Sequence, residues 1–206
     1  MIYKLVISRF KYKVKNALSR LRLKSMKCFL DLDGVLGNLV KGLCEYHRQP
    51  LPTGNYDYDF YEEWGMSFTQ AFKVNDLFWS NLEKTPWCDP LINKTIEVFG
   101  IDNISFLSKP IKYTFGWEGK TEWVTKLSPV FAKKVICCLE KAELAHPGVL
   151  LIDDNDYNID SFTAAGGHGI LVPAPYNKNS DKIHCIEEFL LESLDNFKMT
   201  HGLWER

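Results

Sequence analysis

Short apolar runs alternate with helical periodicity along most of the chain. Apolar runs bounded by turn-forming residues predict strands, and apolar positions three or four residues apart predict amphipathic helices. Strands are predicted at 27–32, 104–107, 134–138, 149–152 and 169–172. Helices are predicted at 90–99, 121–127, 157–165 and 181–197. Because strands and helices alternate, we expect an α/β fold whose parallel sheet is covered by helices on both faces.

A long segment separates the first predicted strand from the helix at 90–99, and it exceeds an ordinary crossover loop. Short helical patterns within it are found at 38–47, 67–74 and 76–83. Pro50, Pro52 and Gly54 end the first of these patterns, and 56–64 is dense in aromatic residues. Residues 37–88 are therefore predicted to form a small, mainly helical insert.

Two aspartates follow the first strand, one residue apart. Asp31 and Asp33 could share one face of a continued strand, and Gly34 allows the backbone to turn so that both face a common cleft. Two carboxylates at so short a separation repel each other, and a bound divalent cation would relieve the repulsion. A strand-end Asx turn is the alternative interpretation of the same residues.

Further polar side chains end or follow other predicted elements. Ser108 and Lys109 follow the second strand, Lys120 opens the segment 120–126, and Asp153 and Asp154 end the apolar run at 149–152. Ligands of parallel sheets bind at the carboxyl ends of the strands, so these residues predict one site there. These residues also have interpretations that involve no ligand. Lys120 could be an exposed helix-start lysine, and the aspartate pair could cap the following helix.

The order Asp-x-Asp, Ser, Lys, Asp-Asp resembles the haloacid dehalogenase-like (HAD) phosphohydrolases. It is closer still to the cytosolic and mitochondrial 5′(3′)-deoxyribonucleotidases, which share Asp-x-Asp-Gly-Val-Leu, Ser/Thr-x-Pro, Lys-x-x-Trp-Val and Leu-Leu-Ile-Asp-Asp. The resemblance covers about residues 27–172. It implies a HAD-like Rossmannoid catalytic core at 27–36 and 89–206, with residues 37–88 forming a small helical cap after the first strand.

The resemblance also implies roles for the acidic residues. Asp31 would be the nucleophile that forms an aspartyl-phosphate, and Asp33 the general acid and then the general base. This agrees with the chemistry, which needs one ionised carboxylate and one that carries a proton. Mg²⁺ would be bound by the Asp31 carboxylate, the Asp33 backbone carbonyl and Asp153, with Asp154 orienting a metal-bound water or the lysine. Oxygen ligands with retained waters suit Mg²⁺.

Three residues are expected to bind the phosphoryl group. The resemblance implies that Ser108 donates a hydrogen bond to it and that Lys120 neutralises its charge, as lysine does in other phosphate sites. The resembled enzymes carry an arginine after the third strand, whereas 136–140 contains none. Lys109 could supply the missing charge, and the choice among 5′-, 2′- and 3′-phosphates stays open.

Aromatic residues of the predicted cap could stack on a nucleobase. Phe78 and Trp79 precede a Leu-Glu pair, where the resembled family has base-stacking aromatics, and Trp64 is a further candidate. The alternative is that these side chains form the hydrophobic core of the cap, because aromatics dominate small cores.

The net charge of −1 hides an asymmetry. Residues 1–27 hold nine Lys or Arg and no acid, leaving 16 basic and 26 acidic residues in the rest, a net of −10. Such an acidic body argues against binding to a nucleic acid polymer, which requires a basic surface. The six cysteines show no CxxC pair or small-scaffold spacing, which is typical of free thiols in a reducing compartment.

The basic segment 1–26 would be amphipathic as a helix. It could lie on an anionic membrane surface, act as a transit peptide, or be an appendage or an upstream start before Met26. We favour the appendage, because chains of the resembled family usually begin close to their first strand. A cytoplasmic location follows, or a mitochondrial one if 1–25 is a transit peptide.

We therefore expect a Mg²⁺-dependent phosphatase whose partner is a small nucleotide, a (deoxy)ribonucleoside monophosphate. A HAD phosphatase for another small phosphate ester is the first alternative, since fold and motifs determine chemistry better than substrate. A non-catalytic phosphate-binding protein is the second. The preferred base, the sugar and the oligomeric state, a homodimer included, stay open.

Overall fold

The structure is a computed structural model that describes residues 26–110 and 116–203. Residues 1–25 of the predicted basic segment lie outside this range. The strands are β1 (Lys27–Leu30), β2 (Ile104–Ser108), β3 (Val135–Cys137), β4 (Val149–Asp153) and β5 (His168–Leu171). They form one parallel sheet in the order β3-β2-β1-β4-β5. The predicted α/β fold with a parallel sheet flanked by helices is confirmed.

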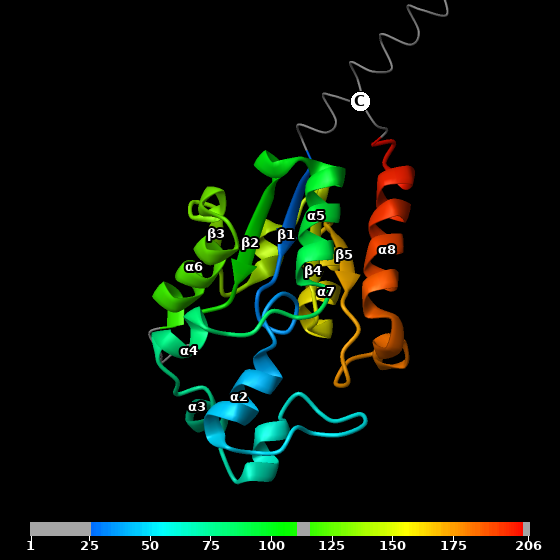
Figure 1. Ribbon diagram of the computed structural model, residues 1–206. Helices are drawn as coiled ribbons and strands as arrows, with labels where there is room; N and C mark the ends of the chain where they lie inside the picture. The colour runs from blue at the N-terminus through cyan, green and yellow to red at the C-terminus, as the bar shows by residue number, and fades with distance from the viewer. Residues whose placement is uncertain (1–25, 111–115, 204–206) are drawn as a thin grey trace, which may run out of the picture.

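Helices cover both faces of this sheet (Figure 1). The α-helices are α2 (Leu39–His47), α3 (Phe68–Ala71), α4 (Asp76–Ser80), α5 (Cys88–Phe99), α6 (Gly116–Leu127), α7 (Asp156–Ala164) and α8 (Ile186–Thr200). The 3₁₀ helices are η1 (Phe60–Trp64), η2 (Ile101–Asn103), η3 (Pro129–Phe131), η4 (Lys141–Leu144) and η5 (Ser180–Cys185).

The residues of β1 suit the central position of this strand in the sheet. Cys28 and Leu30 pack into a core shared with α5, α6 and α8, whereas Phe29 packs on the opposite face, in a core shared with α7. Successive side chains of a strand point to opposite faces, so a strand buried on both faces must be apolar throughout. The unbroken apolar run before Asp31 satisfies this requirement.

The helical patterns at 67–74 and 76–83 form the shorter helices α3 and α4. Two helices predicted for the core also differ from those observed. The helix predicted at 121–127 begins at Gly116, because the glycines of its first turn weaken the helical signal although they favour close packing. The helix predicted at 181–197 is divided into η5 and α8. The division occurs at Cys185, whose backbone (φ −139°, ψ 35°) leaves the helical region.

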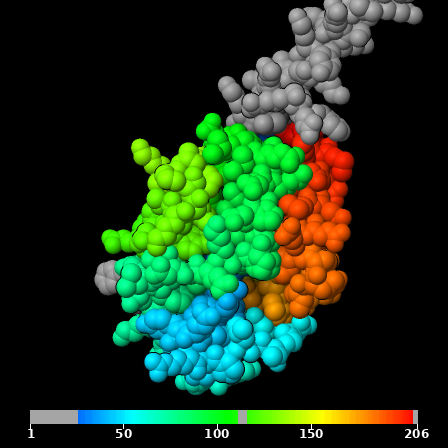
Figure 2. All heavy atoms as spheres, in the orientation of Figure 1, coloured from blue at the N-terminus to red at the C-terminus, as the bar shows by residue number. Residues whose placement is uncertain are grey.

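The insert after β1 has a hydrophobic cluster of its own. Its buried members come from α2, η1, α3, the segment after α3, and α4, and the cluster is rich in aromatic residues. This insert cluster consists of Leu39, Leu43, Cys44, Phe60, Tyr61, Ala71, Phe72, Val74 and Trp79. Helices α2, α3 and α4 lie beyond the carboxyl ends of the strands (Figure 1), and the insert packs directly against the core (Figure 2). The division into core and cap domains stays a prediction, although this cluster accords with it.

Within the two described stretches, no helix has the length and apolar character needed to cross a bilayer.

Helix α4 of the insert is held tightly against α6 of the core. A Cβ atom at Gly116 would lie 2.6 Å from Trp79 Nε1, and one at Gly119 would collide with the Asp76 carbonyl oxygen and lie 2.8 Å from Trp79 Cβ. The Gly119 N–H also donates to Asp76 Oδ1 at 3.3 Å. The two glycines therefore permit a contact that any larger residue would disturb.

We expect Gly119→Ala to destabilise the protein by about 1–3 kcal/mol, because the new methyl group meets backbone rather than a flexible side chain. In an exposed helix the same change stabilises by roughly 1 kcal/mol, so the sign is diagnostic. Chemical denaturation measures the difference, with Glu118→Ala on the exposed face of α6 as the control. A stabilised Gly119→Ala protein would contradict this packing.

Candidate active site

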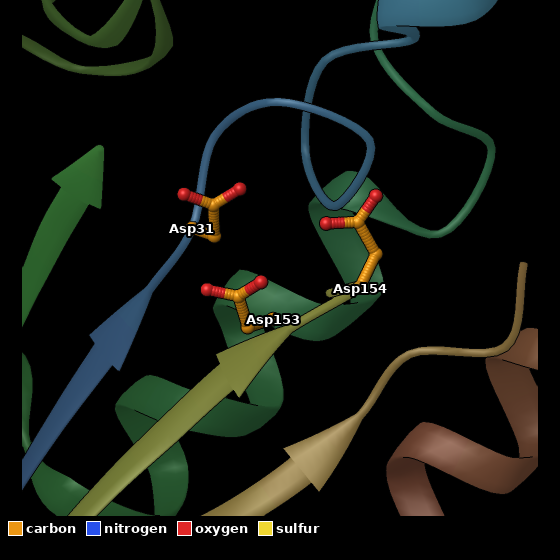
Figure 3. A group of neighbouring side chains, drawn as sticks. All are labelled: Asp31, Asp153 and Asp154. Atoms are coloured by element: carbon orange, nitrogen blue, oxygen red, sulfur yellow. The ribbon is translucent and has the colours of Figure 1, made fainter. Parts of the chain in front are cut away.

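The predicted site residues converge at the carboxyl ends of the central strands. Asp31 follows β1, Ser108 ends β2 and Asp153 ends β4, and all three side chains are buried. Strands β2 and β4 both pair with β1 in parallel, so their carboxyl ends meet at one edge of the sheet. The side chains of Asp31, Asp153 and Asp154 lie together there (Figure 3).

The loop that follows β1 approaches Asp154, the residue directly after β4. Gly34 adopts φ +81°, a conformation that favours glycine. A Cβ atom at this position would also collide with the Asp154 carboxylate. The Gly34 N–H donates to the Gly37 carbonyl at 2.9 Å, which closes the loop. Glycine is therefore required here both for the backbone conformation and for the close approach.

Asp31, Asp153 and Asp154 form a buried acidic triad. One carboxylate oxygen from each lies within 4.8 Å of the others. Asp153 is held by the Asn155 N–H at 2.9 Å and by Asn158 Nδ2 at 3.1 Å. Both asparagines belong to the start of α7, where Asn155 is also the N-cap. The fold thus fixes Asp153 rigidly and gathers three carboxylates in one place.

The sequence did not reveal the role of Lys141, which lies in η4 and is buried against this triad. Its Nζ donates to Asp31 Oδ1 and, at 2.7 Å, to Asp153 Oδ2. It therefore supplies positive charge after β3, where 136–140 has no arginine. Lys141 is the first basic residue after β3. The rule that ligands bind at the carboxyl ends of strands would have pointed to it.

Burial and the neighbouring charges shift the pKa values of this cluster. Burial raises the pKa of Asp31 to about 7, an effect that Lys141 partly offsets and that the charges of Asp153 and Asp33 increase. Burial also raises the pKa of Asp154 well above its usual value, and Asp153 adds to the effect. Burial alone would lower the pKa of Lys141, but the charges of Asp31 and Asp153 outweigh it and raise the pKa.

The triad suits a hard divalent cation. Its donors are all carboxylate oxygens, which Mg²⁺ prefers, and Mg²⁺ retains waters where the protein provides few ligands. Lys141 engages one oxygen of Asp31, and within the described residues the other accepts no hydrogen bond. Burial and, after it, the repulsion between the carboxylates raise the pKa values of Asp31 and Asp154 by more than Lys141 lowers them. A bound cation would stabilise their ionised forms.

A second lysine, Lys120, contacts Asp33, the other aspartate of the Asp-x-Asp motif. Lys120 Nζ donates to Asp33 and, at 2.9 Å, to Ser108 Oγ, and Ser108 Oγ donates to Asp33 Oδ2 at 3.3 Å. Lys120 is buried, and its Nζ lies 4.3 Å from the ring centroid of Trp79. The structure therefore brings together Asp33 and two of the predicted phosphate ligands. The Lys109 carbonyl also accepts from Lys120 Nζ at 3.5 Å, whereas the Lys109 side chain extends over Tyr157, with Nζ 5.6 Å from the ring centroid.

The predicted base-stacking residues lie in the insert cluster. Trp79 is 1% exposed and its ring lies beside Lys120, so it supports the lysine in this conformation. Phe78 is half-buried with its ring edge-on to Tyr46 and Trp79, and Trp64 packs on Phe60. These placements accord with the alternative that the aromatics form the core of the insert. Contact with a base stays a prediction for all three.

No protein-family model and no curated protein matches the sequence. Similar solved structures include a haloacid dehalogenase-like hydrolase from Streptococcus pneumoniae, at 13% identity and a TM-score of 0.49, over 84% of this chain and 99% of that one. YfnB of Bacillus subtilis, described as a HAD-type hydrolase bound to magnesium, gives 11% and 0.43, over 71% and 86%. Neither likeness is close enough to identify a reaction or a substrate for this chain.

We expect Lys141→Met to destabilise the protein by about 3–5 kcal/mol at neutral pH, since it leaves buried carboxylates without their positive partner. Chemical denaturation measures the loss. Lys178→Met is the matched control, because the Lys178 side chain is 52% exposed and pairs with Asp156 and Asp160 at the surface. Equal small losses in the two variants would contradict the structural role of Lys141.

Proposed function

We propose that this protein is a Mg²⁺-dependent phosphatase that hydrolyses small phosphate monoesters through an aspartyl-phosphate on Asp31. Deoxyribonucleoside and ribonucleoside monophosphates are the first substrate class. The observation that carries the proposal is the buried contact of Asp31 with Lys141 inside an acidic triad at the carboxyl ends of β1 and β4. A carboxylate enclosed in this way has no evident structural purpose that an apolar residue would not serve better.

The reaction needs a nucleophile, a proton donor for the leaving oxygen and a means of balancing phosphoryl charge. Asp31 attacks phosphorus, the bond from phosphorus to the ester oxygen breaks, and Asp33 gives that oxygen a proton. Water then attacks the phosphorylated Asp31 while Asp33 takes its proton, which releases inorganic phosphate and restores both carboxyl groups. Lys141 keeps one oxygen of Asp31 fixed and favours its ionised form.

Ser108 and Lys120 supply donors for the phosphoryl oxygens. Both contact Asp33 in the structure, so they already lie beside the general acid. When a phosphate group arrives, the same donors would turn to its oxygens. A bound Mg²⁺, held by Asp31, Asp153 and Asp154, would balance the charge of the phosphoryl group. With these assignments each predicted core motif has a role in the reaction.

The proposal that the substrate is a nucleotide rests on the residues that make up the motifs and on the aromatic insert beside the site. A HAD phosphatase for another small phosphate ester has the same core chemistry and differs only in the leaving group. The test is a phosphate-release screen over nucleoside monophosphates, sugar phosphates and phosphoamino acids, each with Mg²⁺ and with a chelator. Release from nucleotides only with Mg²⁺ supports the proposal, and no release from any ester would contradict it.

Asp31→Asn should abolish turnover and leave the fold intact, because an amide cannot attack phosphorus and is close to isosteric. Removal of a nucleophile costs other enzymes roughly 1,000-fold or more in kcat. Phosphate release measures the loss and circular dichroism the fold. Asp160→Asn, which changes an exposed aspartate of α7, is the control. A folded Asp31→Asn enzyme with near-normal turnover would overturn the assignment.

Phe78→Ala should lower kcat/KM for nucleotides by about tenfold or more if its ring stacks on the base, since such stacking is worth about 1–3 kcal/mol. Ribose phosphate has the sugar and the phosphate but no base, so its kcat/KM should change far less. Steady-state kinetics on the two substrates gives the ratio. Equal losses on both would show that Phe78 only holds the insert together.

A further inference from the structure

The loop that follows β5 holds Asp154 in two ways. The Tyr176 hydroxyl donates to Asp154 Oδ2, and Asn177 Nδ2 donates to the Asp154 carbonyl at 2.8 Å. Asn177 Nδ2 also donates to the Val172 carbonyl at 2.7 Å, which anchors the loop to the end of β5. A Cβ atom at Gly34 would lie 2.9 Å from the Tyr176 hydroxyl, so the group is closely enclosed.

Part of the insert packs against the ring of the same tyrosine, Tyr176. The rings of Tyr56 and Tyr58 lie against the Tyr176 ring, with centroids 5.8 and 5.3 Å away. Asn55 Nδ2 donates to Ser180 Oγ at 3.4 Å, a second contact between the same two segments. Tyr56 also packs edge-on against Phe60, a buried member of the insert cluster. An unbroken series of contacts thus joins the insert cluster to Asp154.

Asp153 is held differently. Its partners among the described residues are Asn155, Asn158 and Lys141, all of which belong to the core. Asp31 likewise meets Lys141. Of the three carboxylates of the triad, Asp154 is the one whose hydrogen-bonded partner among the described residues contacts the insert. The hydrogen-bonded route from the insert to the triad therefore runs through Tyr176.

We propose that Tyr176 is a positioning residue that couples docking of the insert segment 55–58 to the orientation of the Asp154 carboxylate and so to metal affinity. Partners in the outer shell of a ligating carboxylate orient it, and their removal commonly costs 10–100-fold in metal affinity. Coupling is reciprocal, so a bound metal favours the docked insert to the same extent. The inference rests on the proposed function, because it treats Asp154 as part of the metal site.

The test is Mn²⁺ binding without substrate, measured from the electron paramagnetic resonance signal of the free ion. Tyr176→Phe keeps the ring that meets the insert and removes only the hydroxyl, and it should weaken Mn²⁺ binding by roughly tenfold or more. Tyr157→Phe, at a tyrosine of α7 that is 63% exposed, is the matched control and should bind as the wild type does.

A second variant, Tyr56→Leu with Tyr58→Leu, keeps the Tyr176 hydroxyl and removes the docking rings. It should weaken Mn²⁺ binding by roughly fivefold or more, the lower range of measured couplings. Added to Tyr176→Phe, the pair should cause no further loss, because both changes act through one hydroxyl. Tyr46→Leu, an insert tyrosine whose ring contacts are His47 and Phe78, is the control.

Wild-type affinity in Tyr176→Phe would overturn the positioning role, and wild-type affinity in the double variant would overturn the coupling. A full additional loss in the triple variant would show that the insert acts by a route other than Tyr176. Each of these results leaves the proposed function in place. Failure of the wild-type protein to bind Mn²⁺ would contradict the proposed function and this inference together. Circular dichroism and thermal unfolding confirm that each variant is folded.

Discussion

Burying three carboxylates at one edge of a sheet costs free energy unless positive charge lies among them. Lys141, which lies after β3 in η4, meets this requirement because it contacts both Asp31 and Asp153. The neighbouring strands β1 and β4 place the two aspartates, and within the described residues Lys141 is the group that contacts both of them. Asp154, which accepts no hydrogen bond from this lysine among the described residues, accepts one from the Tyr176 hydroxyl instead. The charge that remains uncompensated is what a divalent cation would bind.

The two lysines divide the site into two halves. Lys141 serves the carboxylates of the proposed nucleophile and metal site, and Lys120 serves Asp33 and Ser108, the proposed proton donor and a phosphate ligand. Each lysine is buried, so each must be held where its charge is needed. Lys120 is supported by the Trp79 ring, an interaction that desolvation strengthens. The insert therefore contacts residues of the candidate site from two sides, through Trp79 beside Lys120 and through Tyr56 and Tyr58 beside Tyr176.

The sheet and much of the site could be predicted because they depend on local patterns. Apolar runs ending in Asp31, Ser108 and Asp153 are typical of buried strands whose last residues face a ligand, and the structure places these three at the carboxyl ends of neighbouring strands. The sequence places Lys141 close to the carboxyl end of β3, but its contacts with Asp31 and Asp153 depend on how η4 folds back toward them, which local patterns do not give. Trp79 shows a related limit: sequence identifies an aromatic residue near the site, but not whether its ring meets a base or a lysine.

The most direct test of the central claim is a crystal structure of the protein grown with Mg²⁺ and beryllium fluoride, a mimic of a carboxylate-bound phosphoryl group. We expect fluoroberyllate bonded to an oxygen of Asp31, with Mg²⁺ beside it in contact with Asp153 and with Lys141 still paired to Asp31. Fluoroberyllate bound elsewhere, or a triad that stays free of metal at saturating Mg²⁺, would contradict the assignment of Asp31 as the nucleophile beside a metal site.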